Sequence, residues 1–273
     1  MSEKTDKTGN GKKIVSPPRI NVLGVGVSTL NLQSALNLIS NAINEKEKGY
    51  ICVTGVHGIV EAQQDVQFKK ILNKSFLCTP DGMPLVWLGR YFGYKKMDRV
   101  YGPDLMKLVC DWSSKKGVSH FLYGGLPGVA EDLKRKLEVN YPGINIVGCY
   151  SPPFGPLSKD EEERLINIVR ELKPDLFWIG LSTPKQERFM AQYLDKLDTT
   201  IMISVGAAFD FLTGRVKQAP RWIQRAGLEW FYRMCCEPKR LVPRYLKNNP
   251  IFLLKISLQL SGFKKYKMEG LED

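Results

Sequence analysis

The stretch YICVTGVHGIVEAQQDVQFKKILNKSFLCT, residues 50–79, decides the fold class. Its ends, 50–55 and 76–79, are short apolar runs typical of buried strands, and apolar residues recur at helical spacing from about 58 to 73. A strand, a helix and a second strand form the unit from which parallel sheets are built, because the helix carries the chain back to the start of the next strand. The stretch therefore predicts an α/β domain.

The same alternation extends in both directions from this stretch. Further strands are expected at 19–27, 119–125, 145–150, 175–180 and 200–206, and further helices at 32–44, 103–116, 128–140, 158–172 and 184–195. A capping box, Ser158 followed by Glu161, marks the start of one of these helices. We expect a Rossmann-like, mainly parallel sheet with helices on both faces, formed by residues 18–215.

The composition is that of a globular protein. The chain has 273 residues, of which 43% are hydrophobic and 25% charged. Residues 1–17 are polar and are predicted to form a disordered tail. The six cysteines form no C-x-x-C pair and lie mostly in apolar runs, which indicates buried free thiols in a reducing cytoplasm.

The pattern changes after residue 215. Residues 220–267 hold eleven basic and two acidic residues, so an anionic partner is expected. We expect three helices, broken at Pro238 and Pro250, with aromatic residues among the arginines. The longest apolar run, IFLL, is too short to span a bilayer. Residues 216–265 are therefore predicted to be an amphipathic appendage at an anionic membrane surface; the alternative is a helical cap packed on the sheet.

Glycines and polar residues recur where the predicted strands end. In parallel sheets the ligand site lies past these carboxyl ends, and glycine lets the backbone approach a phosphate closely. Gly206 is one such residue, and the recurrence favours a nucleotide pocket over ordinary tight turns. TPDGMPLVW (79–87) places Asp81 at another strand end, either as a turn residue or as a base at the mouth of the pocket.

The presence or absence of known sequence motifs limits which reactions and ligands the site is expected to serve. GVGVSTLN (24–31) is a weak dinucleotide fingerprint, and the sequence contains no P-loop, no G-x-S-x-G elbow and no D-x-D. His57 and His120 have no partner at metal-ligand spacing. We therefore expect no metal site, and expect any bound diphosphate to be neutralised by backbone amides, helix N-termini and Lys or Arg.

Five motifs together resemble the TagA/WecG/CpsF family of bacterial glycosyltransferases. They are TPDGMPLVW, RVYGPDL (99–105), GLSTPKQERFM (180–190), VGAAFDFLTGRVKQAP (205–220) and LEWFYRMCCEPKRLVPRYL (228–246). The resemblance implies an inverting transferase that moves a sugar from a UDP-sugar to a polyprenyl-diphosphate-linked sugar, with no cofactor and no essential metal. It further implies work on cell-surface polysaccharide or teichoic acid by a cytoplasmic enzyme, peripheral on the inner face of the membrane.

The resemblance also implies roles for residues. Asp81 matches the family's base, which takes the proton of the acceptor hydroxyl. Thr54, at a neighbouring strand end, is expected to orient Asp81 or a sugar. Arg233, Arg240 and Arg244 of the basic segment are expected to grip a diphosphate.

The nucleotide is expected at the later motifs. Lys185 and Gln186 follow Pro184 at a helix start and are expected near the diphosphate. Asp210 is expected to bind the ribose, with a helix cap as the alternative, and Gly206 to line the site. Tyr150 and Phe154 are expected to stack on uracil, and Glu187 with Arg188 are candidates for a surface ion pair.

Several questions stay open in the sequence. The donor sugar is N-acetylmannosamine, its uronic acid or a hexose. No motif identifies the polymer or the exact acceptor. The oligomeric state is also open, and a homo-oligomer is one alternative. Arg99, Tyr101 and Asp104 have no assigned role. Two other classes compete: a nicotinamide-dependent oxidoreductase and a basic nucleic-acid-binding protein. The aliphatic residues of the basic segment favour lipid over nucleic acid, so no nucleic-acid partner is expected.

Overall fold

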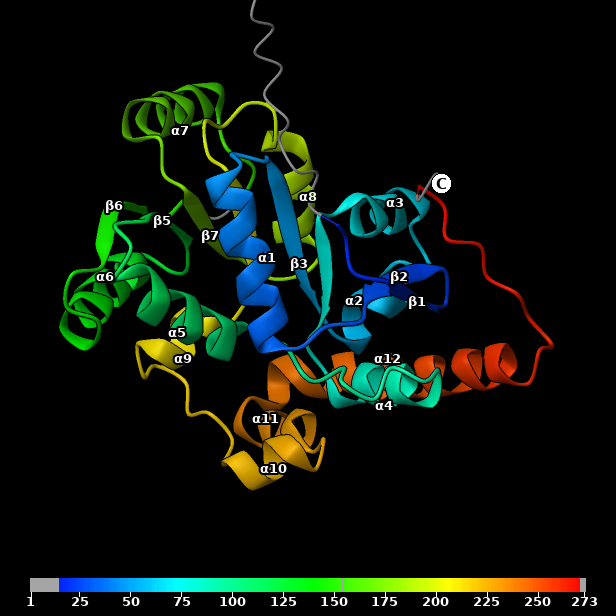
Figure 1. The fold of residues 1–273 in the computed structure, drawn as a ribbon. Helices are drawn as coiled ribbons and strands as arrows, with labels where there is room; N and C mark the ends of the chain where they lie inside the picture. Colours follow the sequence, from blue (N-terminus) through cyan, green and yellow to red (C-terminus); the bar gives the residue numbers. More distant parts are fainter. Residues whose placement is uncertain (1–14, 154, 271–273) are drawn as a thin grey trace, which may run out of the picture.

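A six-stranded parallel sheet lies at the centre of the computed structural model (Figure 1). The structure describes residues 15–153 and 155–270, and residues 1–14 of the predicted tail lie outside it. The strands are β1 Arg19–Val22, β2 Val25–Ser28, β3 Gly49–Thr54, β4 Leu77–Pro80, β5 Ser119–Gly124, β6 Asn145–Tyr150, β7 Leu176–Gly180 and β8 Ile201–Ser204. The order in the main sheet is β4-β3-β8-β7-β5-β6, which confirms the predicted parallel α/β fold.

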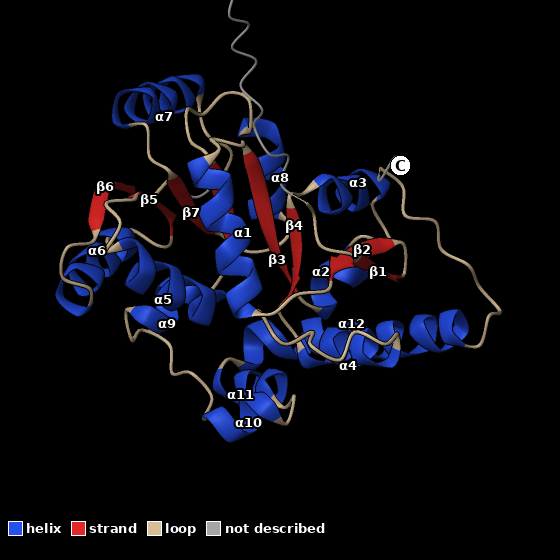
Figure 2. Cartoon of the chain, viewed as in Figure 1, coloured by secondary structure: helices blue, strands red, loops and turns tan. Residues whose placement is uncertain are grey.

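Helices cover both faces of this sheet (Figure 2). They are α1 Leu32–Asn44, α2 Val56–Glu61, α3 Val66–Lys74, α4 Met83–Tyr91, α5 Gly102–Ser113, α6 Val129–Asn140, α7 Lys159–Leu172, α8 Lys185–Tyr193, α9 Ala208–Leu212, α10 Arg221–Arg225, α11 Glu229–Cys236 and α12 Pro238–Leu260. Successive side chains of a strand point to opposite faces. Tyr50 and Cys52 of β3 accordingly join one hydrophobic core, and Ile51 and Val53 join the other.

The predicted strand 19–27 is wrong as a single element. β1 and β2 pair antiparallel as a hairpin outside the main sheet. Leu23 and Gly24 have positive φ angles of 54° and 83°, so the chain reverses within two residues. The turn residues Leu23 and Gly24 lie inside a run, 22–27, made only of valine, leucine and glycine, which concealed the turn.

Three helix predictions also need correction. The helix predicted at 58–73 is two helices, because the Asp65 side chain accepts a hydrogen bond from the Phe68 N–H and caps α3. Residues 83–91 form α4, which was not predicted. The chain breaks before Pro238 as expected, but Pro250 lies inside α12.

The helices α10 to α12 pack under the carboxyl ends of the strands (Figure 1). Gln259 of α12 accepts a hydrogen bond from the Leu23 N–H and donates one to the Asn21 carbonyl, both over 2.7 Å. Asn248 Nδ2 donates to His57 Nδ1 of α2 over 2.7 Å. The basic segment therefore packs against α2 and the β1–β2 hairpin, and its association with an anionic membrane surface stays a prediction. Within the described residues, no helix is long and apolar enough to cross a membrane.

The cysteines are free, but only some of them are buried. Cys52, Cys78 and Cys110 are buried in the strands and helices of the α/β region, and Cys149 is half-buried. Cys235 and Cys236 are exposed at the end of α11, which the apolar runs around the other cysteines did not predict.

Candidate active site

A cavity of about 830 Å³ lies at the carboxyl ends of β4, β3, β8 and β7. The loops after these strands contribute Asp81, Gly55, Gly206 and Thr183. The opposite wall comes from α10 to α12. This is the position expected for the ligand site of a parallel sheet.

Asp81 directly follows β4 and faces this cavity. Its N–H donates to the Thr54 carbonyl over 3.0 Å, which fixes the residue to the end of β3. Its Oδ1 atom is buried and has no hydrogen-bond partner. Burial raises the pKa of Asp81 to about 6, although Arg99 opposes this shift. A carboxylate with a raised pKa and an unoccupied oxygen fits a general base.

The Thr54 hydroxyl is bonded inside its own strand, and its predicted role in orienting Asp81 or a sugar stays a prediction. It donates to the Cys52 carbonyl over 3.3 Å, and Thr54 is not among the described residues that line the cavity. Thr54 positions Asp81 through its backbone carbonyl.

Arg99 joins Asp81 to the C-terminal helices. Its Nε donates to the Asp81 carbonyl, and its Nη2 atom lies 3.9 Å from Asp81 Oδ1 but only 2.6 Å from Glu229 Oε2. Its guanidinium stacks on the Tyr101 ring, 4.0 Å from the centroid, and Tyr101 donates to Glu229 Oε1 over 2.6 Å. Glu229 thus holds Arg99 away from the carboxylate of Asp81.

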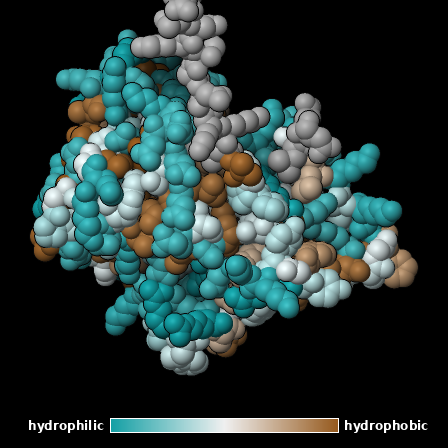
Figure 3. Space-filling view, viewed as in Figure 1, coloured by the Kyte–Doolittle hydropathy of each residue, from teal (hydrophilic) through white to brown (hydrophobic). Residues whose placement is uncertain are grey.

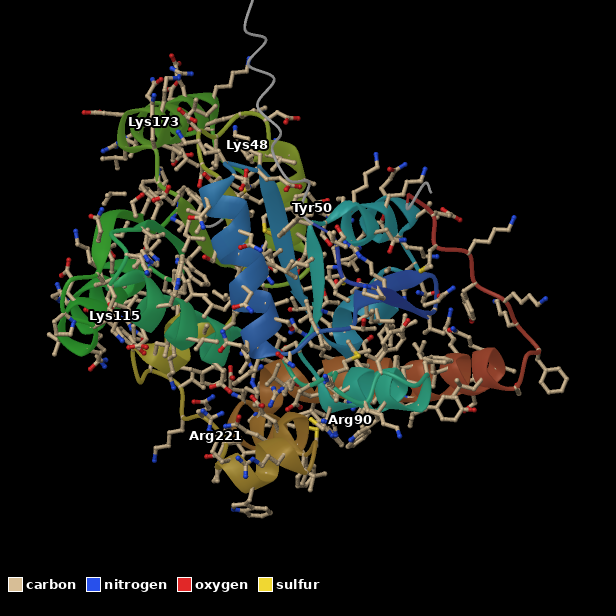
Figure 4. The ribbon with its side chains drawn as sticks, viewed as in Figure 1. Lys48, Tyr50, Arg90, Lys115, Lys173 and Arg221 are labelled. Atoms are coloured by element: carbon tan, nitrogen blue, oxygen red, sulfur yellow. The ribbon has the colours of Figure 1, made fainter. Side chains whose placement is uncertain are left out.

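Asp104 makes a second link between the sheet region and these helices. Arg221 of α10, which is labelled in Figure 4, binds both oxygens of Asp104 over 2.6 and 2.9 Å. Arg99, Tyr101 and Asp104, which had no assigned role, therefore position α10 and α11 over the cavity.

Arg233, Arg240 and Arg244 line the cavity together, as predicted for a diphosphate site. Arg233 Nε is buried without a hydrogen-bond partner, and its guanidinium lies 5.2 Å from the centroid of the Phe211 ring. Burial and the nearby Arg240 and Arg233 lower the pKa of Arg244. Among the described residues, only Glu237 forms ion pairs with Arg233 and Arg240. The cluster is therefore suited to a multivalent anion.

The predicted nucleotide residues divide into two groups. Gln186 and Gly206 both line the cavity, and the Gly206 N–H donates to Gln186 Oε1 over 3.1 Å. Lys185 is exposed at the start of α8, and it is not among the described lining residues. The surface pair of Glu187 and Arg188 is wrong: Glu187 is buried, with Thr183 donating to it over 2.9 Å, and Arg188 pairs with Asp65.

Asp210 and Tyr150 are also absent from the described lining residues. Asp210 is half-buried on α9, where burial raises its pKa and Arg240 opposes the shift. Tyr150 ends the edge strand β6 and stacks on Tyr123, with 6.1 Å between the centroids. Phe154 lies outside the described residues. The ribose and uracil roles of these residues stay predictions.

Sequence reasoning missed Glu229 at this cavity, and it missed that residues 83–91 form a helix there. Glu229 is one of only two acidic residues in the basic segment, and this isolation was the available signal. The α4 residues follow the D-G-x-P turn, where Pro84 stands near the start of the helix. A proline at the first turn of a helix is favourable, and it was the signal for α4.

The fold and this cavity define an α/β protein that brings the carboxylate of Asp81 and a cluster of three arginines together at the ends of parallel strands. The sequence model of the glycosyl transferase WecG/TagA/CpsF family matches residues 20–266. The chain belongs to this family and is a glycosyltransferase.

Two relatives carry more specific names. A protein of Bacillus subtilis (strain 168) is 29% identical over 221 residues, which cover 79% of this chain and 84% of the relative. A protein of Bacillus spizizenii (strain ATCC 23059 / NRRL B-14472 / W23) is 28% identical over the same shares. Both are named N-acetylglucosaminyldiphosphoundecaprenol N-acetyl-beta-D-mannosaminyltransferase.

Proposed function

We propose that this protein is an inverting transferase that moves N-acetylmannosamine from a UDP-sugar to a polyprenyl-diphosphate-linked N-acetylglucosamine. The observation that carries the proposal is the meeting of Asp81 with Arg233, Arg240 and Arg244 in one cavity. The names of the two relatives support the sugar and the acceptor. The product would serve cell-surface polysaccharide or teichoic acid synthesis at the inner face of the membrane.

The chemistry needs one base and one charged leaving group. The acceptor hydroxyl oxygen attacks the anomeric carbon while Asp81 takes the hydroxyl proton. The bond from that carbon to the diphosphate oxygen breaks with its electron pair, and UDP leaves. Arg233, whose Nε is buried without a hydrogen-bond partner, neutralises the charge that develops on the diphosphate of the leaving UDP, and Arg240 and Arg244 bind the diphosphate of the acceptor. A single displacement inverts the anomeric centre.

The test is turnover with a panel of UDP-sugars and a short-chain prenyl-diphosphate-linked N-acetylglucosamine. We expect UDP release and a disaccharide-lipid product with UDP-N-acetylmannosamine, and a slower rate with UDP-glucose or the uronic acid. Product analysis by nuclear magnetic resonance reports the anomeric configuration. Tight NADH binding without UDP binding would instead favour an oxidoreductase, and salt-sensitive DNA or RNA binding by the basic segment would favour the nucleic-acid alternative.

We expect a chelator to leave this activity largely intact, because three arginines at the cavity supply positive charge for the diphosphate. In the described residues, no three His, Cys, Asp or Glu side chains gather as a metal site. The rate is measured with and without EDTA, with a metal-dependent transferase as the control. Loss of activity in EDTA, restored by Mg²⁺ or Mn²⁺, would contradict the proposed charge neutralisation.

A further inference from the structure

One face of α12 changes in polarity along its length. Its cavity-lining residues recur about every four positions and pass from charged to polar to apolar: Arg240, Arg244, Tyr245, Asn248, Asn249, Pro250, Phe252, Leu253, Ile256 and Leu260. At 1.5 Å per residue, the distance from Arg244 to Leu260 is about 24 Å along the helix axis. The charged end adjoins the catalytic cavity.

A stripe on α4 lines the same cavity. It consists of Met83, Trp87, Leu88 and Tyr91, again spaced by about one turn. Trp87 packs closely on Gly227 in the turn between α10 and α11, where an added Cβ would lie 2.8 Å from its ring. Trp87 is nevertheless 50% exposed and Leu253 is 63% exposed. We call these two facing stripes the α4–α12 groove; Figure 3 shows tan and brown surface at the lower right, where Figure 1 places both helices.

We propose that the α4–α12 groove binds the first isoprene units of the lipid chain of the acceptor. This inference rests on the proposed function. The diphosphate lies at Arg240 and Arg244, and the hydrocarbon runs from there along α12 toward Leu260.

A polyprenyl diphosphate is the ligand whose polarity matches that of the groove along its length. A polyprenyl diphosphate carries its charge at one end and is apolar elsewhere, and the groove has the same order of charges and apolar side chains. An amphipathic helix of a partner protein would leave the three arginines without an anion. The asymmetry also fits an acceptor whose sugar reaches Asp81 while its chain stays in the groove.

The chain offers a matched pair of variants for the test. Leu253 lines the groove, whereas Leu254 is equally exposed, at 65%, and is not among the described lining residues. The two leucines have the same size and lie on the same helix. Leu253→Gln and Leu254→Gln therefore change general surface hydrophobicity equally, but only the first changes the groove.

The experiment uses the full chain without vesicles, and soluble prenyl-diphosphate-N-acetylglucosamine acceptors with two and with four isoprene units. For the wild type, we expect kcat/KM to be about tenfold higher with the longer acceptor, because more apolar surface is buried. Leu253→Gln should lose most of this preference through a higher acceptor KM, with the UDP-sugar KM unchanged. Leu254→Gln should behave as the wild type.

Other outcomes would overturn the inference in distinguishable ways. Equal kcat/KM with both acceptors would contradict lipid binding in the groove but would leave the proposed function intact. No transfer to either acceptor would contradict both the lipid site and the proposed function. Equal effects of the two substitutions would indicate that the general hydrophobicity of the α12 surface, and not the groove, sets the preference for the longer acceptor. A dimer that dissociates only in Leu253→Gln, measured by sedimentation, would assign the groove to a second copy of the chain. UDP binding by each variant verifies that it is folded.

Discussion

Asp81→Asn should lower turnover by about a hundredfold or more and leave the affinity for UDP nearly unchanged. The amide keeps the shape of the side chain but accepts no proton from the acceptor hydroxyl. Asp81 Oδ1 has no hydrogen-bond partner, so the substitution breaks no hydrogen bond at this atom. Single-turnover rates measure the chemical step, and calorimetry measures UDP binding. A variant that keeps most of the activity would exclude Asp81 as the base.

The pH dependence follows from the raised pKa of Asp81. Below about 6 the carboxylate binds a proton and no longer acts as a base, so kcat/KM should fall as the pH falls through this value. The charged or titratable groups that influence it are Arg99, Tyr101, Glu229, Arg233 and Tyr245. They come from the loop before α5, from α11 and from α12.

Glu229→Gln should move the fall of kcat/KM on the acidic side of the pH profile to lower pH. The substitution removes a negative charge that raises the pKa of Asp81, and it releases Arg99 to pair with Asp81 Oδ1, 3.9 Å away. The maximum rate should fall as well, because the carboxylate becomes a weaker base. Asp104→Asn is the control: it loosens the contact with Arg221 but leaves Arg99 in place. If the pH at which kcat/KM falls is the same in Glu229→Gln as in the wild type, Glu229 serves only to fix the position of α11.

The second large effect concerns the arginine cluster. Substituting Lys for Arg233 or Arg244 should lower kcat/KM for the lipid acceptor by about 10- to 100-fold, because lysine keeps the charge but loses the fork that binds two phosphate oxygens. Arg240→Lys should have a smaller effect, since Arg240 is exposed and already pairs with Glu237. Steady-state kinetics with a soluble acceptor measures these changes.

Arg225→Lys is the matched control for the cluster. Arg225 is exposed on α10 and is not among the described lining residues of the cavity, so its substitution should leave the kinetics unchanged. Binding to anionic vesicles should survive in every lysine variant, because the charge is retained. If Arg233→Lys, Arg240→Lys and Arg244→Lys all work normally, the C-terminal helices are only a packing cap.

Much of the fold could be predicted from the sequence, because strands and helices are marked by local patterns of apolar residues. The strand and helix periods around residues 50–79 predicted parallel strands with helices on both faces, and the structure confirms them. The position of Asp81 at a strand end placed it at the ligand edge of the sheet. The excess of arginine after residue 215 likewise pointed to an anion.

The sequence by itself indicated most of the strands and helices, the family, and the residues proposed for the two halves of the site, Asp81 and the arginines. Only the tertiary structure decided that these halves share one cavity and that Arg99 pairs more closely with the carboxylate of Glu229 than with that of Asp81. Tyr101 and Glu229 are 128 positions apart, and their contact depends on how α11 docks. The α4–α12 groove depends on docking in the same way. Periodicity reports the burial of each element, whereas a site made by two elements is defined only when their packing brings the side chains together.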